Sequence, residues 1–268
     1  MNIDTLINTI DIYTANDTAI AFSGGVDSSL LLKLTLESAR RNKTNVYAIT
    51  VKTPFTTQED IDTACRAAEE MKAEHIIIHI SSFNELGISH NPPDRCYICK
   101  KNIFTQIIEM AKELGVTTIL EGTNYDDMNM YRPGIKAIRE LNIISPLAQC
   151  RITKNNIRRL AEHFGISTAK RPSTPCFATR FPYNTYISYE DIINAEKGEN
   201  YIKSLGFHNV RLRVHGNIAR IEVDEEYYAR AISLRYEIID KLKSLGYDYV
   251  VLDMEGFRSG SMDITLNS

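Results

Sequence analysis

An α/β fold with a parallel sheet is predicted by three features of this sequence. Short apolar runs alternate with helical segments through the first half of the chain. The run at 18–22 is followed at once by the glycine turn SGGVDSS and then by a helical segment, an order typical of a nucleotide-binding sheet. After the proline-rich stretch KRPSTPC the order of elements changes, which predicts a main domain over 1–170 and a smaller C-terminal α+β domain over 171–268.

The predicted main domain begins with an amphipathic helix, because isoleucines and a leucine recur at helical spacing near the N-terminus. Four buried strands are expected at 18–22, 45–51, 75–80 and 116–120. Helices are expected between them at 57–72 and 100–114. Thr56 and Glu59 are spaced as a capping box for the first of these helices. Such alternation predicts a parallel sheet that binds ligands at the carboxyl ends of its strands.

The rest of the chain is predicted to be helical before the proline-rich stretch and mixed after it. Residues 133–164 favour helix, with a break at 145–147. Beyond the stretch, we expect a helix, two strands, a helix and a strand at 188–205, 209–215, 217–223, 225–245 and 247–253. This order indicates a small α+β unit of ferredoxin-like character.

Composition restricts the class of protein. The chain has 268 residues, of which 43% are hydrophobic and 24% are charged, with a net charge of −3. This acidic balance argues against a wide nucleic-acid interface, because such interfaces are strongly basic. No apolar run is long enough for a membrane span, and the start has no basic leader, so we expect a cytoplasmic protein. Its five cysteines are then expected to be thiols, metal ligands or catalysts.

The string SGGVDSS predicts a phosphate-binding loop. Two glycines let the backbone approach a ligand closely, and the following helix offers free N–H groups to an anion. The serines can donate further hydrogen bonds. Asp27 is an unusual neighbour for a phosphate, and a bridging Mg²⁺ explains its presence. The alternative is an ordinary glycine turn before a helix.

Three cysteines form a candidate centre. Cys96 and Cys99 are spaced i, i+3, and Cys176 lies far downstream. We weigh four interpretations: an iron–sulfur cluster on all three thiols, a zinc site with a fourth ligand such as His90, a redox pair, and Cys176 acting alone. Cys65 shares an apolar helix face and Cys150 has no partner motif, so both are interpreted as structural.

Polar residues at three further places are candidate site residues. Glu121, Asn124, Asp126 and Asp127 follow a buried strand, although a capped turn would also use these residue types. Arg180 could stabilise a thiolate or a developing oxyanion, and a surface-loop role is the alternative. Further candidates are Arg211 and Arg213 for a phosphate, and Glu196 and Asp224 as acidic metal ligands. A solvent-facing polar edge is the alternative for the two arginines.

The loop string resembles the PP-loop of the ATP pyrophosphatase superfamily, which includes GMP synthetase, NAD synthetase and sulfur-transferring enzymes. The resemblance implies a Rossmann-like sheet and cleavage of ATP between its α and β phosphates, leaving an adenylated acceptor. It implies an adenine pocket near Ile49 and Val51. The nucleotide and its Mg²⁺ would be bound by Ser23, Gly24, Gly25, Val26, Asp27, Ser28, Ser29, Glu121, Asn124, Asp126 and Asp127.

A longer series of strings is similar to the LarE family, the ATP-dependent sulfur transferases of nickel-pincer cofactor synthesis. The similarity extends from the PP-loop nearly to the end of the chain. Its strings are EGTNYDD (121–127), RPG (132–134), SPL (145–147), RPSTPCFATRFPY (171–183), RLRVHG (211–216), ARIEV (219–223) and DMEGFRSGSM (253–262).

This resemblance implies a substrate and a sulfur source. The substrate would be a pyridinium-3,5-biscarboxylic acid mononucleotide, whose carboxylates are adenylated and become thiocarboxylates. In the simplest members, a cysteine at the position of Cys176 gives up its own sulfur and becomes dehydroalanine. Members with an added CxxC hold a 4Fe–4S cluster with a spare sulfide, and Cys96 and Cys99 match that type. The family also implies a substrate phosphate on Arg211 and Arg213, and a homo-oligomer, in the family a hexamer.

Other classes remain open at this point. A tRNA thiolase would also combine a PP-loop with CxxC and a third cysteine, but the net acidity counts against it. An ammonia-dependent synthetase would not explain the three cysteines. An iron–sulfur carrier that uses ATP only for regulation would show no ATP–pyrophosphate exchange.

Overall fold

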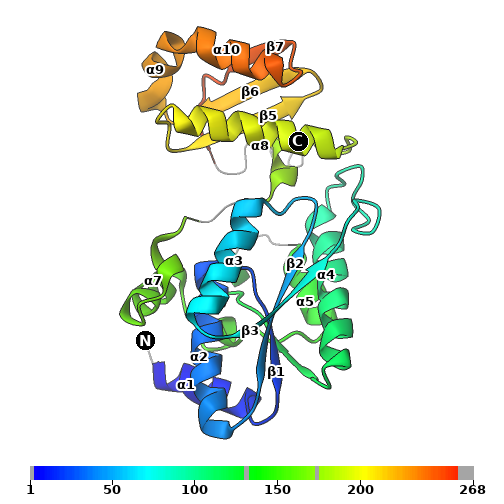
Figure 1. Cartoon of the computed structure of the whole chain (residues 1–268), viewed down its shortest axis with the longest axis vertical. Coiled ribbons are helices and arrows are strands. Elements are labelled where there is room, and N and C mark those ends of the chain that lie inside the picture. The colour runs from blue at the N-terminus through cyan, green and yellow to red at the C-terminus, as the bar shows by residue number, and fades with distance from the viewer. Residues whose placement is uncertain (1–2, 130–132, 173–174, 259–268) are drawn as a thin grey trace. The chain divides into compact units, whose positions relative to one another are not determined.

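The computed structural model describes residues 3–129, 133–172 and 175–258 (Figure 1). Arg132 of the string RPG, Ser173 and Thr174 of the proline-rich stretch, and the SGSM string at 259–262 lie outside the described residues. The chain forms two compact units, and each is considered by itself. The first comprises Met1–Ile88 and Asp94–Thr174, and the second comprises Ser89–Pro93 and Pro175–Ser268. The change of unit after residue 174 lies inside the proline-rich stretch.

The first unit contains a four-stranded parallel sheet, as predicted. Its strand order is β3-β2-β1-β4, with β1 paired to β2 and β4, and β2 paired to β3. The strands are β1 Thr18–Ala21, β2 Val46–Lys52, β3 Glu74–His79 and β4 Thr118–Leu120. The helices are α1 Ile3–Tyr13, α2 Val26–Asn42, α3 Gln58–Glu70, α4 Arg95–Glu113, α5 Gly134–Glu140, α6 Pro146–Gln149 and α7 Lys154–His163.

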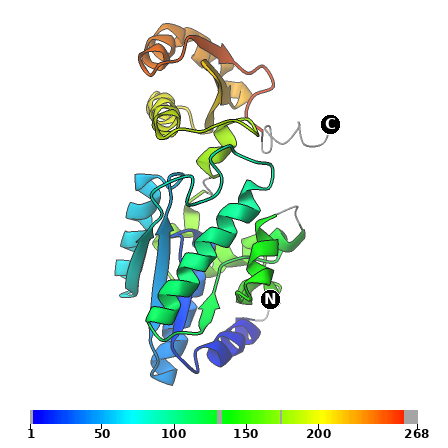
Figure 2. The same ribbon diagram turned by 90° about the vertical axis from the view of Figure 1, so that its right-hand side faces the viewer.

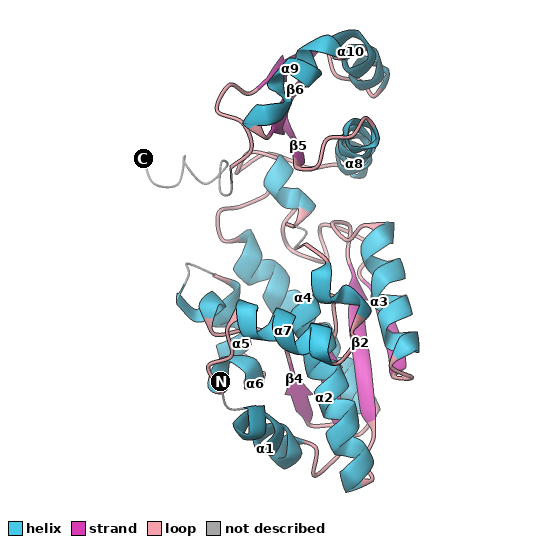
Figure 3. Cartoon of the chain, turned by 90° about the vertical axis from the view of Figure 1, so that its left-hand side faces the viewer, coloured by secondary structure: helices cyan, strands magenta, loops and turns pink. Residues whose placement is uncertain are grey.

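Helices cover both faces of this sheet because its strands are apolar on both sides. Successive side chains of a strand point to opposite faces, so Ala19 joins the core beneath α4 and α5, whereas Ile20 joins the core beneath α1, α2 and α7. Figure 2 shows α4 in front of the strands, and Figure 3 shows α2 and α7 from the opposite side. The carboxyl ends of β1 and β4 therefore open directly onto loops that lead to helices.

Three helix boundaries differ from the sequence prediction. The helix expected at 100–114 begins at Arg95, so the cysteine pair lies within its first two turns. The capping box expected from Thr56 and Glu59 is wrong by one residue: Thr57 is the N-cap and accepts from the backbone N–H of Asp60. The segment expected to be helical at 133–164 is divided into α5, α6 and α7, because left-handed residues end the first two.

The second unit contains a small mixed sheet and three longer helices. Strands β5 Val210–His215 and β6 Ile218–Val223 are antiparallel, and β7 Tyr249–Leu252 lies parallel to β6. Helix α8 Tyr189–Ser204 begins at a capping box of Ser188 and Asp191. The single helix expected at 225–245 is interrupted, giving α9 Tyr228–Ser233 and α10 Arg235–Ser244. The order α, β, β, α, β is otherwise the predicted one.

No helix of the described ranges combines the length and the apolar composition that a bilayer crossing requires.

Candidate active site

The glycine loop between β1 and α2 has the geometry of an anion site. Gly24 has a φ of +68°, and Gly25 is the N-cap of α2 without a side-chain cap bond. The first N–H groups of α2 are therefore available to a ligand, and the helix dipole favours negative charge there. Ser28 stabilises the loop internally, because its hydroxyl donates to Gly25 O at 3.1 Å and lies 3.1 Å from the hydroxyl of Ser23.

Ser23 and Ser29 differ in accessibility, although both were predicted to bind phosphate. Ser23 is exposed at the entrance of the loop. Ser29 is fully buried, and its backbone N–H already donates to Gly25 O at 2.9 Å. A role of Ser29 in phosphate binding stays a prediction, whereas its burial indicates a packing role as well.

The glycine loop is packed tightly against neighbouring backbone. A Cβ added to Gly24 would lie 2.7 Å from the Cα of Ala64 on α3, closer than side chains tolerate. On the other side, a Cβ added to Gly122 would lie 3.0 Å from the backbone nitrogen of Ser28. Two glycines therefore allow α3 and the loop after β4 to approach the start of α2 closely.

Replacing Gly24 with alanine is expected to weaken MgATP binding about tenfold or more. The positive φ costs an L-residue about 1–2 kcal/mol, and the clash with Ala64 adds to it by moving the loop. Titration of MgATP measures the effect. Gly115→Ala is the matched control, because Gly115 has a φ of +74° but open space around its Cβ position. Equal affinity in the two variants would contradict this account of the loop.

The polar residues after β4 are connected to Asp27 through Asn124. Asn124 is buried, and its Nδ2 donates to Asp27 Oδ1 at 3.4 Å. Asn124 Oδ1 in turn accepts from the backbone N–H of Asp127 at 3.1 Å. Asp126 Oδ2 accepts from the backbone N–H of Lys154 at 2.7 Å. These residues therefore connect the start of α2 with the start of α7.

Glu121 has a different environment from its neighbours. Its carboxylate accepts from the backbone N–H of Thr123 at 3.0 Å and from the hydroxyls of Thr123 and Ser145. Lys100 approaches it at 3.9 Å. With its oxygens satisfied inside the protein, Glu121 shapes the loop after β4, and direct binding of nucleotide or metal stays a prediction.

Lys154 was not identified from the sequence, yet it lies in the centre of this group. Its ammonium forms an ion pair with the carboxylate of Asp27. The two residues are 127 positions apart, so no local motif signals the contact. The only hint in the sequence is a lysine at the beginning of a helix, where cations are unfavourable.

The predicted adenine side of the sheet is β2. Ile49 is buried and Val51 is half-buried. Between them, Thr50 donates its hydroxyl hydrogen to Phe22 O at 2.7 Å, and its oxygen lies 2.8 Å from His75 Nε2. Burial lowers the pKa of His75. This end of β2 thus has a hydrogen-bonded polar side chain between two apolar ones, and the adenine pocket itself stays a prediction.

The cysteine pair lies at the start of α4. Cys96 is exposed and Cys99 is half-buried, and neither is in a disulfide. The first turn of α4 has no acidic residue. Cys65 and Cys150 are half-buried, and the thiol of Cys150 lies 3.3 Å from the hydroxyl of Thr9, in agreement with structural roles.

Cys176 precedes a short 3-10 turn, η3 Phe177–Arg180, in the second unit. Its side chain is exposed. Asn91 holds this turn from a distant part of the chain: it is 1% exposed, and its Nδ2 donates to Phe181 O at 3.0 Å and to Pro182 O at 2.9 Å. Asn91 stands five residues before Cys96 in the sequence, so one short segment precedes the cysteine pair and also orders the turn after Cys176.

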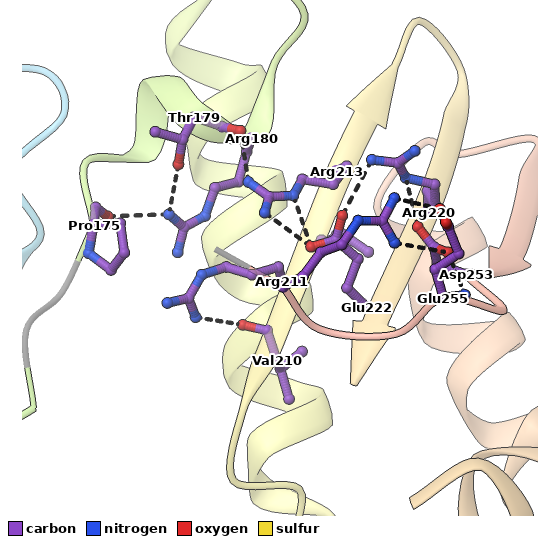
Figure 4. A network of polar contacts seen from close by, with 12 residues as sticks. Pro175, Thr179, Arg180, Val210, Arg211, Arg213, Arg220, Glu222, Asp253 and Glu255 are labelled. Carbon is purple, nitrogen blue, oxygen red and sulfur yellow. Dashed lines mark hydrogen bonds and ion pairs between the residues drawn. The ribbon is translucent and has the colours of Figure 1, made fainter. Parts of the chain in front are cut away.

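Arg180 is not a surface residue, since its side chain is only 1% exposed. It forms a two-pronged ion pair with Glu199 of α8, with Nε–Oε1 at 2.8 Å and Nη2–Oε2 at 3.0 Å. Its Nη1 donates to Pro175 O at 3.0 Å (Figure 4) and to Cys176 O at 3.3 Å. Arg180 thus fixes the backbone on both sides of the Pro175–Cys176 peptide.

Arg211 and Arg213 lie on β5 in different environments. Arg213 is buried, pairs with Glu222 on β6 at 2.8 Å, and donates to Thr179 O at 2.7 Å (Figure 4). Arg211 is half-buried, with its guanidinium 5.0 Å above the ring of Phe257. Burial lowers the pKa of Arg211, and the neighbouring Arg180 adds to this by repulsion. Arg211 therefore has more access to a ligand than Arg213, and a shared phosphate stays a prediction.

Buried carboxylates of the second unit belong to other residues than those predicted. Glu199 and Glu222 are fully buried and paired with arginines, whereas Asp224 accepts from Asn209 Nδ2 at 2.9 Å. Glu196 is half-buried on α8. Among the residues that the structure describes, no three His, Cys, Asp or Glu side chains are grouped as metal ligands. A role of Glu196 and Asp224 as metal ligands stays a prediction.

Comparisons with known proteins agree with this geometry. The family model described as asparagine synthase matches residues 14–105, which include the glycine loop and the strands around it. Over 92% of the chain, the sequence is 36% identical to the pyridinium-3,5-bisthiocarboxylic acid mononucleotide synthase of Lactiplantibacillus plantarum, of which 89% is covered.

Two further relatives can be compared with the mononucleotide synthase. An uncharacterised protein of Synechocystis sp. is 33% identical over 92% of each chain. The tRNA-specific 2-thiouridylase MnmA of Rickettsia bellii is 24% identical, with 81% of this chain and 67% of the relative covered. The similarity to the mononucleotide synthase is thus both higher and more complete than the similarity to the tRNA enzyme.

Proposed function

The chain belongs to the family of the pyridinium-3,5-bisthiocarboxylic acid mononucleotide synthase, and from this we propose a function: ATP-dependent sulfur transfer to a mononucleotide. The proposed acceptor is pyridinium-3,5-biscarboxylic acid mononucleotide, whose carboxylates become thiocarboxylates. The observation that carries the proposal is the identity of 36% over 92% of the chain. It is supported by the glycine loop and by a cysteine, Cys176, on an ordered turn.

The first half of the proposed reaction is adenylation. A carboxylate is a poor electrophile, so it needs a leaving group before sulfur can attack. Its oxygen attacks the α-phosphorus of ATP, the bond to the β-phosphate oxygen breaks, and pyrophosphate leaves. The free N–H groups of α2 would bind the departing pyrophosphate, and Asp27 would hold a Mg²⁺ that neutralises its charge.

The second half is sulfur transfer, for which we propose that Cys96, Cys99 and Cys176 hold a 4Fe–4S cluster. The donor set fits such a group: three cysteines lie outside disulfides, and two of them lie near the start of α4, whose first turn has no acidic residue. When bound, the cluster would supply a sulfide as the sulfur donor. The chain's own part is to keep these thiols in place, through Asn91 and Arg180 around Cys176.

Adenylation is tested by acceptor-dependent exchange of labelled pyrophosphate into ATP. The proposal predicts exchange with the biscarboxylate mononucleotide as acceptor. Exchange that depends on tRNA instead, measured at controlled salt, would support a tRNA thiolase and contradict the proposed acceptor. Formation of an amide with ammonia by a Cys176→Ala variant would point to an amidating synthetase and would also contradict it.

The cluster is tested by assays of iron, zinc and acid-labile sulfide on protein purified without oxygen. About four irons with matching sulfide per chain support the cluster proposal. Zinc without iron would make the cysteine pair a structural metal site. If the protein contains neither iron nor zinc, Cys176 would be a sulfur donor that is consumed. The intact mass of the protein after one turnover should then show the loss of hydrogen sulfide.

The proposed setting follows from the family and from the composition. We propose a cytoplasmic homo-oligomer, of the hexameric kind expected for the family, that binds a small molecule and no nucleic acid. The net charge of −3 supports the last point, since nucleic-acid interfaces are basic. Size-exclusion chromatography with light scattering measures the oligomeric state.

A further inference from the structure

The ion pair between Lys154 and Asp27 connects the glycine loop with the start of α7. Asp27 is in the first turn of α2, and Lys154 is the first residue of α7. Both side chains are partly accessible, with 33% exposure for Lys154 and 22% for Asp27. A ligand that enters the loop can therefore reach both.

Lys154 has an unfavourable position for a lysine with only a structural role. A cation at a helix N-terminus is opposed by the helix dipole, and α7 itself has no acidic residue in its first turn. The backbone of Lys154 is nevertheless fixed there, by its N–H bond to Asp126 Oδ2 and by the capping box of Thr153 and Asn156. The fold thus fixes the main chain and leaves the ammonium next to the phosphate loop.

We propose that Lys154 is a phosphate-binding residue that Mg²⁺ displaces from Asp27. Without nucleotide, the ammonium neutralises the carboxylate in the loop. With MgATP in the loop, the carboxylate of Asp27 would hold the Mg²⁺, and the ammonium of Lys154 would be free to bind a phosphate oxygen. The inference rests on the proposed use of ATP and does not depend on the acceptor or on the sulfur source.

The charges explain why such an exchange is needed. A free carboxylate in the loop would repel ATP, because Asp27 stands among the N–H groups that bind the anion. Paired with Lys154, it is neutral as a group, but the lysine is then occupied. Only the arrival of a divalent cation satisfies Asp27 and releases Lys154 at the same time. Tight binding should therefore require Mg²⁺ and ATP together.

Titrations of ATP with and without Mg²⁺ test the exchange, using protein without acceptor. Lys154→Met is expected to weaken MgATP binding about tenfold or more, since a charge-assisted hydrogen bond is lost. The Asp27→Asn substitution frees the lysine. This variant should therefore bind metal-free ATP several-fold more tightly than the native protein does, and Mg²⁺ should increase its affinity for ATP only slightly. The double variant Asp27→Asn, Lys154→Met should lose that gain.

Lys33→Met is the matched control. Lys33 forms a similar partly exposed ion pair with Glu37 on the same helix, α2, away from the loop, so its loss should leave ATP binding unchanged. Thermal denaturation of each variant shows whether it is folded. Native MgATP affinity in folded Lys154→Met would overturn the proposal, and so would tighter binding, which would make the lysine a mere competitor of Mg²⁺. A protein that binds MgATP as predicted but never modifies the mononucleotide would contradict the proposed function alone.

Discussion

Replacing Cys176 with serine is expected to abolish thiocarboxylate formation, by about a thousandfold or more, while acceptor-dependent pyrophosphate exchange continues. A hydroxyl is neither an iron ligand comparable with a thiolate nor a nucleophile at neutral pH, so the second half of the reaction fails. The first half uses groups of the glycine loop, which belongs to the first unit, whereas Cys176 belongs to the second. The first half is measured as label incorporated into ATP, and the second half is measured as the mass of the mononucleotide product.

Two other cysteine variants sharpen this test. Cys150→Ser is the control, because Cys150 is half-buried beside Thr9 and has no proposed part in the reaction. Cys96→Ser separates the two sulfur sources: with a cluster, repeated turnover is lost, whereas a consumed Cys176 would still give one turnover. Full thiocarboxylate formation by Cys176→Ser would show that the sulfur route proposed here is wrong.

Replacing Arg180 with leucine is expected to destabilise the second unit by about 3–5 kcal/mol, because it leaves the carboxylate of Glu199 buried without its partner. Glu199 also accepts from the backbone N–H of Leu212 at 3.0 Å, so removal of Arg180 should weaken the attachment of β5 as well. The turn after Cys176 loses two bonds from the guanidinium. Chemical denaturation followed by far-UV circular dichroism measures the free energy of unfolding.

The double variant Arg180→Leu, Glu199→Gln should recover part of this loss. Glutamine removes the buried charge but keeps an acceptor for Leu212. As an exposed control in the same unit, Glu255→Gln should change the stability by no more than about 1 kcal/mol, because its ion pair with Arg258 lies in solvent. A loss of similar size in Arg180→Leu and Glu255→Gln would contradict the structural role of the buried pair.

The sequence was sufficient for the sheet and for the phosphate loop because both have local signatures. Alternation of apolar runs with helices gave the parallel sheet, and SGGVDSS gave the position where α2 begins. The start of α4 was predicted too late, because RCYICKK lacks the apolar periodicity that marks the rest of the helix. The misplaced cap at Thr56 has a similar origin: two successive threonines are equally good candidates, and only the backbone selects Thr57.

The contacts that organise the site could not be predicted from the sequence, because they join residues far apart. Lys154 reaches Asp27 across 127 positions, and Asn91 reaches Phe181 across 90. Arg180 was a candidate because it stands four residues after Cys176, but no neighbouring residue indicated that it is buried in an ion pair with Glu199. Pairing of this kind follows from packing of whole elements, which composition and spacing do not encode locally.

The most direct test of sulfur transfer is mass spectrometry of the mononucleotide after incubation with the native protein, ATP, Mg²⁺ and sulfide, without oxygen. The account predicts replacement of a carboxylate oxygen by sulfur, with one AMP released for each replacement and more product than enzyme. An unchanged mononucleotide, with pyrophosphate exchange absent as well, would contradict the proposed reaction.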